Sequence, residues 1–208
     1  MLRNEQDNKA KQQQQQRLTV RILATPTTQD WTVCKDLTLA TVGKSAVKPV
    51  DHAFKELALK SEHSPIRALQ VSWVWENLPS WVSVHLTRHH VGCTPFVQSQ
   101  RNDRQDAYDR NTAPQNTPII HAEVANFQSI IDISKVRLCF NAAAETRYAW
   151  RLFLKELEKY EPELVAFCKP KCVYRGGICG EPRPCNIRPY VGKTAQAYYE
   201  MFGGTTHV

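Results

Sequence analysis

The sequence has no run of about 18 consecutive apolar residues, so it predicts no membrane-spanning helix. Its first residues lack the apolar segment of a secretory signal peptide, and we therefore expect a cytoplasmic protein whose seven cysteines are reduced. Internal repeats are also absent from the sequence. Acidic residues are few, because 20 Asp and Glu against 27 Lys and Arg leave a net charge of +7. That surplus predicts an anionic partner of unspecified kind.

A length of 208 residues with 42% hydrophobic content suits one domain with a packed core. Residues 1–16 are polar and contain a Gln run, so we expect a disordered lead-in there. We place the domain at residues 17–190 and a C-terminal tail at residues 191–208. Strand-like and helical patterns both occur, which predicts a single α+β domain with a mixed or antiparallel sheet and a helix-rich second half.

Apolar and polar residues alternate in residues 18–22 and 68–75, and both stretches therefore predict strands. The second stretch is rich in tryptophan, which we assign to the core. Residues 77–79 (Asn-Leu-Pro) predict a turn. Residues 80–90 fit a helix or a strand, and residues 92–95 (Gly-Cys-Thr-Pro) predict an end to regular structure.

Three stretches have helical spacing of their apolar residues. Residues 51–60 predict a short amphipathic helix with Asp51 as N-cap and Leu57 on its apolar face. Residues 121–131 predict a second helix. A third helix is expected after Asn141, a plausible N-cap, and it runs to about residue 160.

The densest basic cluster is Arg88-His89-His90, and Arg101, Arg104 and Arg110 follow it. Arginine presents a planar fork of donors that matches phosphate oxygens, and it keeps its charge at neutral pH. Gly92 and the neighbouring hydroxyl residues favour a loop that wraps a ligand and supplies backbone N–H groups. The cluster predicts an anion site, with a solvated basic face as the alternative.

At these residues the sequence resembles the flavin-dependent thymidylate synthases, especially their short, phage-type members. The resemblance is best over residues 63–137, and residues 169–179 are similar to the C-terminal region of the phage-type members. Several spacings between these residues match the family pattern at once, and this joint match is more specific than a match of any single motif. The matching pieces are Ser64-Pro65, Arg88-His89-His90, Ser99-Gln100-Arg101, and Arg110 followed by Ala113-Pro114, Asn126, Asp132 and Arg137.

The resemblance implies a chemistry carried by cofactors. In that family reduced FAD relays a methylene group from methylenetetrahydrofolate to carbon 5 of dUMP and then delivers hydride, and NADPH reduces the flavin again. No protein cysteine attacks the uracil, so the protein positions ligands and stabilises charge. The family is homotetrameric with active sites shared between subunits. The resemblance therefore implies a homotetramer whose partners are small molecules rather than nucleic acid, in a phage or its host's cytoplasm.

The same resemblance assigns roles to residues. Arg137 would contact the uracil edge and favour its anionic form, and Ser99 would act with it in catalysis. The residues expected to bind dUMP are His85, Arg88, Ser99, Gln100, Arg101, Arg110 and Arg137. The residues expected to bind FAD are Ser64, Arg88, His89, His90, Asn126 and Asp132.

The sequence departs from the family pattern at several of these places. His90 stands where the family has a third basic residue, Arg, and Arg67 stands where the family has Glu. Phe96 and Val97 replace an Asn-Glu pair, and Asp132 replaces an Asn. These changes leave open a flavoenzyme that modifies another pyrimidine nucleotide, or a nucleotide binder without activity.

Four cysteines, Cys168, Cys172, Cys179 and Cys185, fall within 18 residues of a loop-rich segment. Their spacing is irregular for zinc, so we expect separate reduced thiols and no metal, with a zinc site on these four as the alternative. A rival function would use that alternative: a basic nucleic-acid-binding protein with a zinc–cysteine loop.

The other cysteines carry no clear chemistry. Cys93 could be taken for a nucleophile, but it lacks a recognisable set of partner residues, which disfavours the classical cysteine-dependent thymidylate synthases. Cys34 and Cys139 are expected in the core.

Overall fold

The structure is a computed structural model that describes residues 17–45, 48–105 and 109–185. A four-stranded antiparallel sheet runs in the order β1-β2-β4-β3. The expected α+β class with an antiparallel sheet and a helix-rich second half is confirmed. The expected lead-in at residues 1–16 and tail at residues 191–208 lie outside the described residues. The strands are β1 (Thr19–Ala24), β2 (Gln70–Pro79), β3 (Cys93–Val97) and β4 (Pro118–Asn126).

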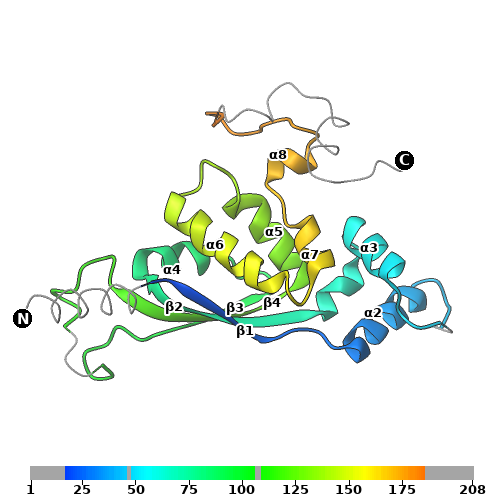
Figure 1. Cartoon of the computed structure of the whole chain (residues 1–208), viewed down its shortest axis with the longest axis horizontal. Coiled ribbons are helices and arrows are strands. Elements are labelled where there is room, and N and C mark those ends of the chain that lie inside the picture. The colour runs from blue at the N-terminus through cyan, green and yellow to red at the C-terminus, as the bar shows by residue number, and fades with distance from the viewer. Residues whose placement is uncertain (1–16, 46–47, 106–108, 186–208) are drawn as a thin grey trace, which may run out of the picture.

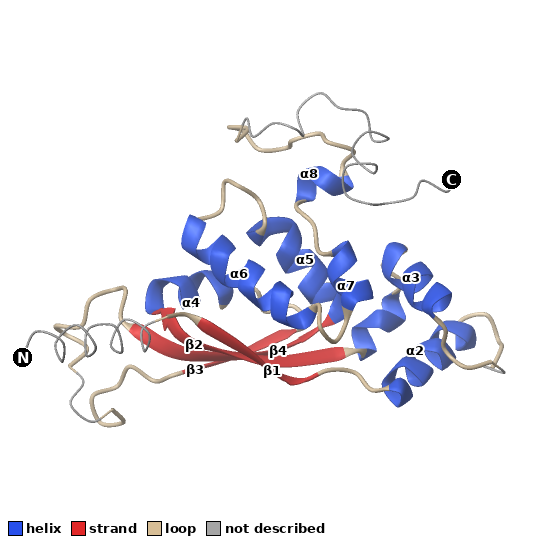
Figure 2. Cartoon of the chain, viewed as in Figure 1, coloured by secondary structure: helices blue, strands red, loops and turns tan. Residues whose placement is uncertain are grey.

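Helices of the second half of the chain cover one face of the sheet, and two helices of the first half lie beyond one end of it (Figure 1). Figure 2 shows the same two layers, with strands below and helices above. Among the described residues, no helix is long and apolar enough to cross a membrane. The helices are α2 (Thr28–Ala40), α3 (His52–Lys60), the 3-10 helix η1 (Ser64–Ala68), α4 (Ser80–Leu86), α5 (Phe127–Arg137), α6 (Ala144–Leu157), α7 (Pro162–Phe167) and α8 (Lys171–Tyr174).

The core lies between β2 and α6 and is built from aromatic rings. Trp73 and Trp75 of β2 are completely buried, as the alternation of residues 68–75 predicted. Trp73 stacks on Phe153 of α6 with ring centres 4.1 Å apart, and Trp150 packs edge-on against Trp73. The indole N–H of Trp75 donates to the carbonyl of Ala149 over 3.2 Å. These contacts fix α6 on the sheet.

A polar cluster is buried beside this aromatic core. His121 and Glu123 of β4 are 0% and 1% exposed, because both side chains point toward the helices. Nδ1 of His121 and Oγ of Ser83 on α4 are 2.7 Å apart, and Nε2 of His121 lies 3.6 Å from a carboxylate oxygen of Glu123. The sheet thus buries two ionisable side chains on its core face.

The predicted helix over residues 121–131 is wrong in its first half. Residues up to Asn126 form β4, and the helix begins only at Phe127. The alternation of β4 places His121 and Glu123 on the buried side, so its pattern lacks the apolar face that identifies a strand. Asn126 is the N-cap of α5, since its side-chain oxygen accepts a 2.9 Å hydrogen bond from the N–H of Ser129.

Two other expectations about strands are also wrong. Residues 77–79 do not turn, because β2 continues to Pro79 through an irregularity at Asn77, whose φ is 59°. Pro95 does not interrupt regular structure, because β3 is an edge strand and proline is tolerated there. Residues 80–86, left open between helix and strand, form α4.

The helix ends differ from the sequence expectations in two places. Asp51 caps α3 as expected, but Leu57 is 67% exposed, and Ala58 and Leu59 face the core instead. Asn141 does not cap α6; the N-cap position is Ala143, and the Asn141 amide donates to the carbonyl of Arg183 over 2.8 Å.

Candidate active site

The basic loop, residues 88–92, follows α4 and is hydrogen-bonded to the start of α5. The N–H of Asn126 donates to the carbonyl of Gly92 over 2.9 Å, and Oγ of Ser129 donates to the carbonyl of Val91 over 2.7 Å. Asn126 also accepts from Oγ of Ser129 over 2.9 Å. The N-cap of α5 therefore holds residues 88–92 in place.

Gly92 makes this close approach possible. Its φ is +66°, a conformation that side chains with Cβ rarely adopt. A Cβ at this position would lie 2.3 Å from Nδ2 of Asn126 and 2.4 Å from Oγ of Ser129. No other residue type fits here without moving the N-cap of α5.

A cavity of about 320 Å³ opens between the basic loop, η1 and the first turns of α5. It brings together five residues that the family resemblance assigned to FAD binding, although they are up to 44 residues apart in the chain. Those five are Arg88, His89, His90, Asn126 and Asp132. The other residues that line the cavity are Arg67, Val91, Gly92, Gln128, Ser129 and Ile133.

Arg137 lies at the C-terminal end of α5 and contacts the basic loop from outside the cavity. Its Nε donates to Nε2 of His89 over 2.8 Å, and its NH2 group donates to the backbone carbonyl of His85. Burial and the charge of Arg88 lower the pKa of Arg137. Arg137 thus links α4, α5 and the loop that carries the cavity's cations.

His89 is neutral in this arrangement. Burial, followed by the charges of Arg137 and His90, lowers its pKa to about 4. Because Nε2 accepts from Arg137, the ring proton belongs on Nδ1, which can then donate to a ligand. Burial and the charges of Arg137 and Arg88 also lower the pKa of His85, whose Nδ1 lies 3.1 Å from Oγ1 of Thr146.

Asp132 is held at the rim of the cavity by a network of charges. Lys135 donates to both oxygens of Glu62 over 2.8 Å and to Asp132 over 2.9 Å. Gln128 donates to Asp132 over 3.2 Å and also contacts Glu62. The two arginines of the lining, Arg67 and Arg88, outnumber the single carboxylate of Asp132, so the net charge of the lining is positive.

Three of the lining residues with polar side chains were not assigned to the site from the sequence. Arg67 was noted only as a departure from the family pattern, yet it lines the cavity with Arg88 as a second cation. Gln128 and Ser129 are part of the N-terminal turn of α5, and the prediction of a helix starting at residue 121 concealed that turn. The pattern Asn126-x-x-Ser129, typical of an N-cap, could have revealed it.

Other expected residues lie elsewhere in this chain. Within its described residues, the lining of the cavity does not include Ser64, which is exposed on η1. The remaining expected dUMP residues follow β3, at the end of that strand opposite Gly92. Five residues of strand separate the two groups by about 15 Å. The residues of that second group are Ser99, Gln100, Arg101 and Arg110.

Gln100, Arg101 and Arg110 of this second group are exposed, Ser99 is partly buried, and the contacts of the group are local. Arg101 makes a bidentate contact with Asp103, from Nε over 2.9 Å and from NH2 over 2.6 Å. Oγ of Ser99 accepts from the N–H of Arg101 over 3.3 Å. The N–H of Arg110 donates to the side chain of Asn102 over 3.1 Å. One chain therefore holds the two halves of the expected site apart.

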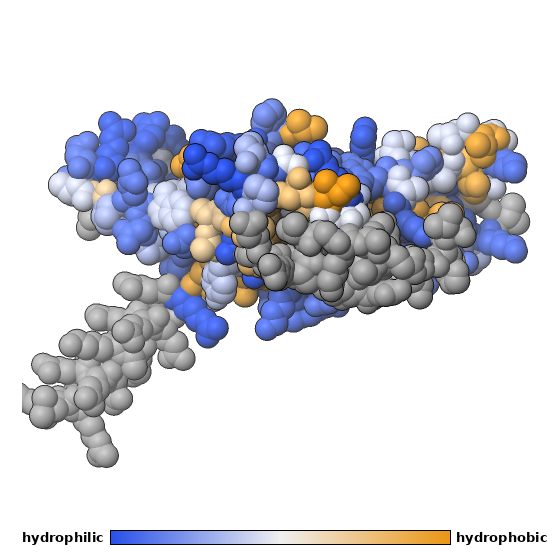
Figure 3. Space-filling view, turned by 90° about the horizontal axis from the view of Figure 1, so that it is seen from above, coloured by the Kyte–Doolittle hydropathy of each residue, from blue (hydrophilic) through white to orange (hydrophobic). Residues whose placement is uncertain are grey.

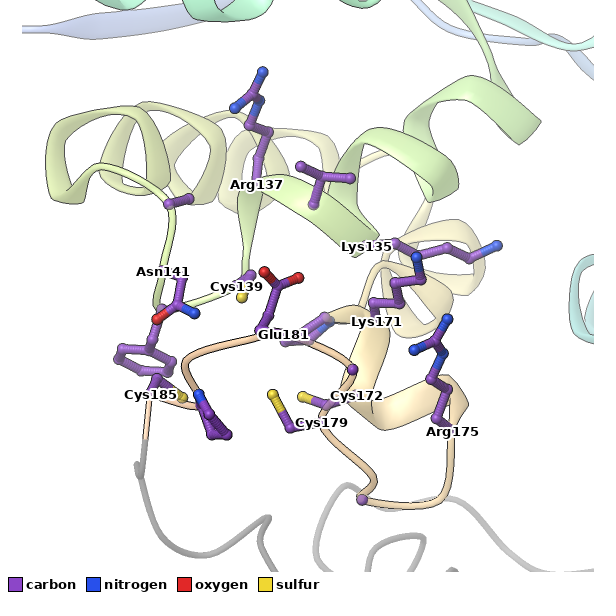
Figure 4. A pocket seen from close by; sticks show the side chains of 17 residues that line it. Lys135, Arg137, Cys139, Asn141, Lys171, Cys172, Arg175, Cys179, Glu181 and Cys185 are labelled. Atoms are coloured by element: carbon purple, nitrogen blue, oxygen red, sulfur yellow. The ribbon is translucent and has the colours of Figure 1, made fainter.

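A second cavity, of about 340 Å³, lies on the other side of Arg137 (Figure 4). Four cysteines line it, but they are not the four that the sequence grouped: Cys139, Cys172, Cys179 and Cys185. Cys139 is partly exposed rather than a core residue. Cys168 lies apart in the core, where burial raises its pKa to about 12. Among the described residues, no three His, Cys, Asp or Glu side chains stand together as metal ligands.

Cys93 is buried at the start of β3. Burial raises the pKa of its thiol, and the neighbouring carboxylate of Glu123 raises it further. A thiol in this state stays protonated at neutral pH and is a poor nucleophile. Cys34 is buried as expected, and burial raises its pKa to about 11.

No protein-family model matches the sequence, and no curated protein is similar enough to match it. The fold, however, is similar to solved structures. One is thymidylate synthase X (ThyX) from Helicobacter pylori with FAD and dUMP, at 13% identity and a TM-score of 0.58, covering 73% of this chain and 99% of that one. Another is the UMP/dUMP methylase PolB from Streptomyces cacaoi bound with 5-Br dUMP, at 12% identity and a TM-score of 0.57, covering 73% of this chain and 94% of that one. The fold of this chain is therefore the fold shared by ThyX and PolB, as the resemblance in its sequence predicted.

Proposed function

We propose that this protein is an FAD-dependent thymidylate synthase that methylates dUMP, with methylenetetrahydrofolate as carbon donor and NADPH as reductant. One observation carries the proposal. The fold brings Arg88, His89, His90, Asn126 and Asp132 to one cation-lined cavity, and the sequence resemblance assigned all five to FAD. The likeness of the fold to a structure that holds FAD and dUMP supports it.

The donors of the cavity suit an anionic, planar cofactor. Arg67 and Arg88 supply fixed positive charge for phosphate oxygens, and Nδ1 of the neutral His89 supplies a directed donor. Asn126 and Ser129 also line the cavity, and the amide of Asn126 could bind a carbonyl or ring nitrogen group. When bound, FAD would supply the methylene relay and the hydride.

Arg137 would act on the substrate rather than on the cofactor. A fixed cation beside the uracil lowers the cost of its anionic form, which is the more nucleophilic one. The contacts of Arg137 with His89 and with the carbonyl of His85 orient its guanidinium before any ligand arrives. Such preorganisation avoids rearrangement during the reaction.

A second copy of the chain would complete the site. A cavity of about 320 Å³ is at the lower limit for a ligand of drug size, and the expected phosphate-binding residues Ser99 and Arg101 lie beyond the opposite end of β3. In Figure 3, the part of the helix-covered side that grey atoms leave visible shows hydrophilic residues with a few hydrophobic ones between them. The opposite face of the sheet, by contrast, exposes Phe96 and Ile120, each more than half exposed. Assembly of a homotetramer through that face would bury them and join the two halves.

A second candidate substrate follows from the same cavity. Arg67 adds a cation where the resembled family has a carboxylate, and PolB, of the same fold, is a UMP/dUMP methylase. We therefore keep methylation of another pyrimidine nucleotide, UMP first, as the alternative reaction. Comparison of UMP and dUMP in one assay separates the two.

The test is release of tritium from dUMP labelled at carbon 5, with FAD, NADPH and methylenetetrahydrofolate added to the full-length protein. We expect release that requires all three additions and that Arg88→Ala abolishes. Arg151→Ala is the matched control, because Arg151 is exposed on α6, outside the cavity. Release from labelled UMP alone would favour the alternative substrate. No release from either nucleotide would contradict both.

A further inference from the structure

Four cysteines from three chain segments line the second cavity. Cys139 follows α5, Cys172 lies in α8, and Cys179 and Cys185 lie in the loop after α8. Figure 4 shows the sulfurs of Cys172 and Cys179 beside each other, with Cys139 and Cys185 around the same space. The thiols of Cys139 and Cys179 lie near that of Cys172.

Backbone and amide hydrogen bonds hold these segments together. The N–H of Gly177 donates to the carbonyl of Cys172 over 2.9 Å, in a turn where Gly176 and Gly177 both have positive φ. That turn returns the chain from Cys172 to Cys179. The amide of Asn141 donates to the carbonyl of Arg183 over 2.8 Å, which keeps the loop of Cys185 next to that of Cys139.

Little apolar packing accounts for this arrangement. Among the described residues 169–185, Val173 is the only buried hydrophobic side chain. A segment with so small a core needs another source of stability, and protein segments of this kind use metal ions or disulfides.

We propose that Cys139, Cys172, Cys179 and Cys185 are the ligands of a structural zinc ion. Each thiol would lose its proton on binding, and four thiolates would surround the ion tetrahedrally at about 2.3 Å. No three of these groups yet stand together at ligand distances in the described chain. Binding therefore requires the thiols of Cys139 and Cys185 to move toward those of Cys172 and Cys179.

The surroundings offset the charge of the complex. Zinc with four thiolates carries a net charge of −2, and Lys171 and Arg175 line the same cavity. The guanidinium of Arg175 lies against Gly180, where a Cβ would come within 2.0 Å of NH1. The absence of a side chain at Gly180 thus lets the guanidinium of Arg175 lie against the backbone that follows Cys179.

Cys168 provides a sharp control for this set of ligands. It lies within the same stretch of sequence, but its thiol is buried in the core and contacts the carbonyl of Leu164 over 3.5 Å. The geometry assigns the fourth ligand to Cys139, which is 33 residues before Cys172, and excludes Cys168.

The experiment measures metal content of the full-length protein purified from zinc-supplemented cells, together with its FAD content. We expect about one zinc per chain, lost in Cys139→Ser and Cys179→Ser and retained in Cys168→Ser. Retention of zinc in Cys139→Ser, or its loss only in Cys168→Ser, would overturn the assignment. FAD content is read on the same samples, so failure of the zinc site and failure of the proposed function are distinguishable.

If the variants do not fold, a titration of the unsubstituted protein with Co²⁺ tests whether the four thiols bind a metal ion. Tetrahedral thiolate ligation predicts intense ligand-field and thiolate-to-cobalt charge-transfer bands that Zn²⁺ displaces. Absence of these bands, or a Cys172–Cys179 disulfide found by mass spectrometry in protein purified without reductant, would refute the site.

Discussion

Nε of Arg137 donates a 2.8 Å hydrogen bond to Nε2 of His89, and this contact joins the end of α5 to the basic loop. The bond exists only while Nε2 is unprotonated, because an imidazolium would set two cations against each other. Burial first, and the charge of Arg137 second, lower the pKa of His89 to about 4, so the contact with Arg137 is present at neutral pH.

The pH dependence of stability should reflect His89. Its pKa is about 4 in the folded chain and 6.5 in the unfolded one, so between those pH values the unfolded chain binds the extra proton. The stabilisation is complete above pH 6.5 and is lost as the pH falls toward 4. Denaturant unfolding in a pH series should show this fall in the wild type and a flatter profile in His89→Gln. Equal slopes in the two proteins would contradict the contact.

Glu161 should contribute with the opposite sign. Its side chain is 3% exposed, and burial raises its pKa from 4.5 to about 7. Between those values the folded chain retains a proton that the unfolded chain loses, so stability falls as the pH rises from 4.5 to 7. The effect amounts to about 3 kcal/mol at most. Glu161→Gln should remove this fall, and a variant that keeps it would show that another group titrates.

Gly92 and Gly43 form a matched pair for backbone strain. Both have positive φ, but a Cβ at Gly43 has open space around it, whereas one at Gly92 meets Asn126 and Ser129. Gly43→Ala should cost about 1 kcal/mol of unfolding free energy. Gly92→Ala should cost about 3 kcal/mol and should weaken FAD binding. If the two substitutions cost the same, the fastening of the basic loop to α5 is unimportant.

Arg137→Ala should separate the substrate from the cofactor. Removal of a preorganised cation costs about 100-fold or more in turnover, and we expect this loss in kcat/KM for dUMP. FAD should remain bound, because Arg137 does not line the cavity assigned to it among the described residues. Equilibrium FAD binding and steady-state rates check both parts. Unchanged dUMP affinity and rate would remove Arg137 from the site.

The strands that follow apolar alternation could be predicted from the sequence. Trp73 and Trp75 predicted β2 because aromatic residues point inward at every second position. Strand β4 was not predicted because its buried positions include the polar residues His121 and Glu123. Burial of two ionisable side chains depends on partners from α4 and β4 together, and no local pattern reports such partners.

The candidate site was predicted in part for a similar reason. The family resemblance singled out Arg88, His89, Asn126 and Asp132, and the fold brings them together because the N-cap of α5 binds the basic loop. The same resemblance also included Ser99 and Arg101, but the length of β3 separates them from the cavity. A sequence motif does not show how far apart a strand holds its residues in space, nor how the chain assembles with other chains.

The most direct test of the central claim is a spectral titration of the full-length protein with FAD and then dUMP. We predict a flavin absorption band that dUMP perturbs saturably, lost in Arg88→Ala and retained in Arg151→Ala. A colourless protein that takes up no added FAD, yet binds DNA with a steep dependence on salt, would contradict the account and favour a nucleic-acid-binding function.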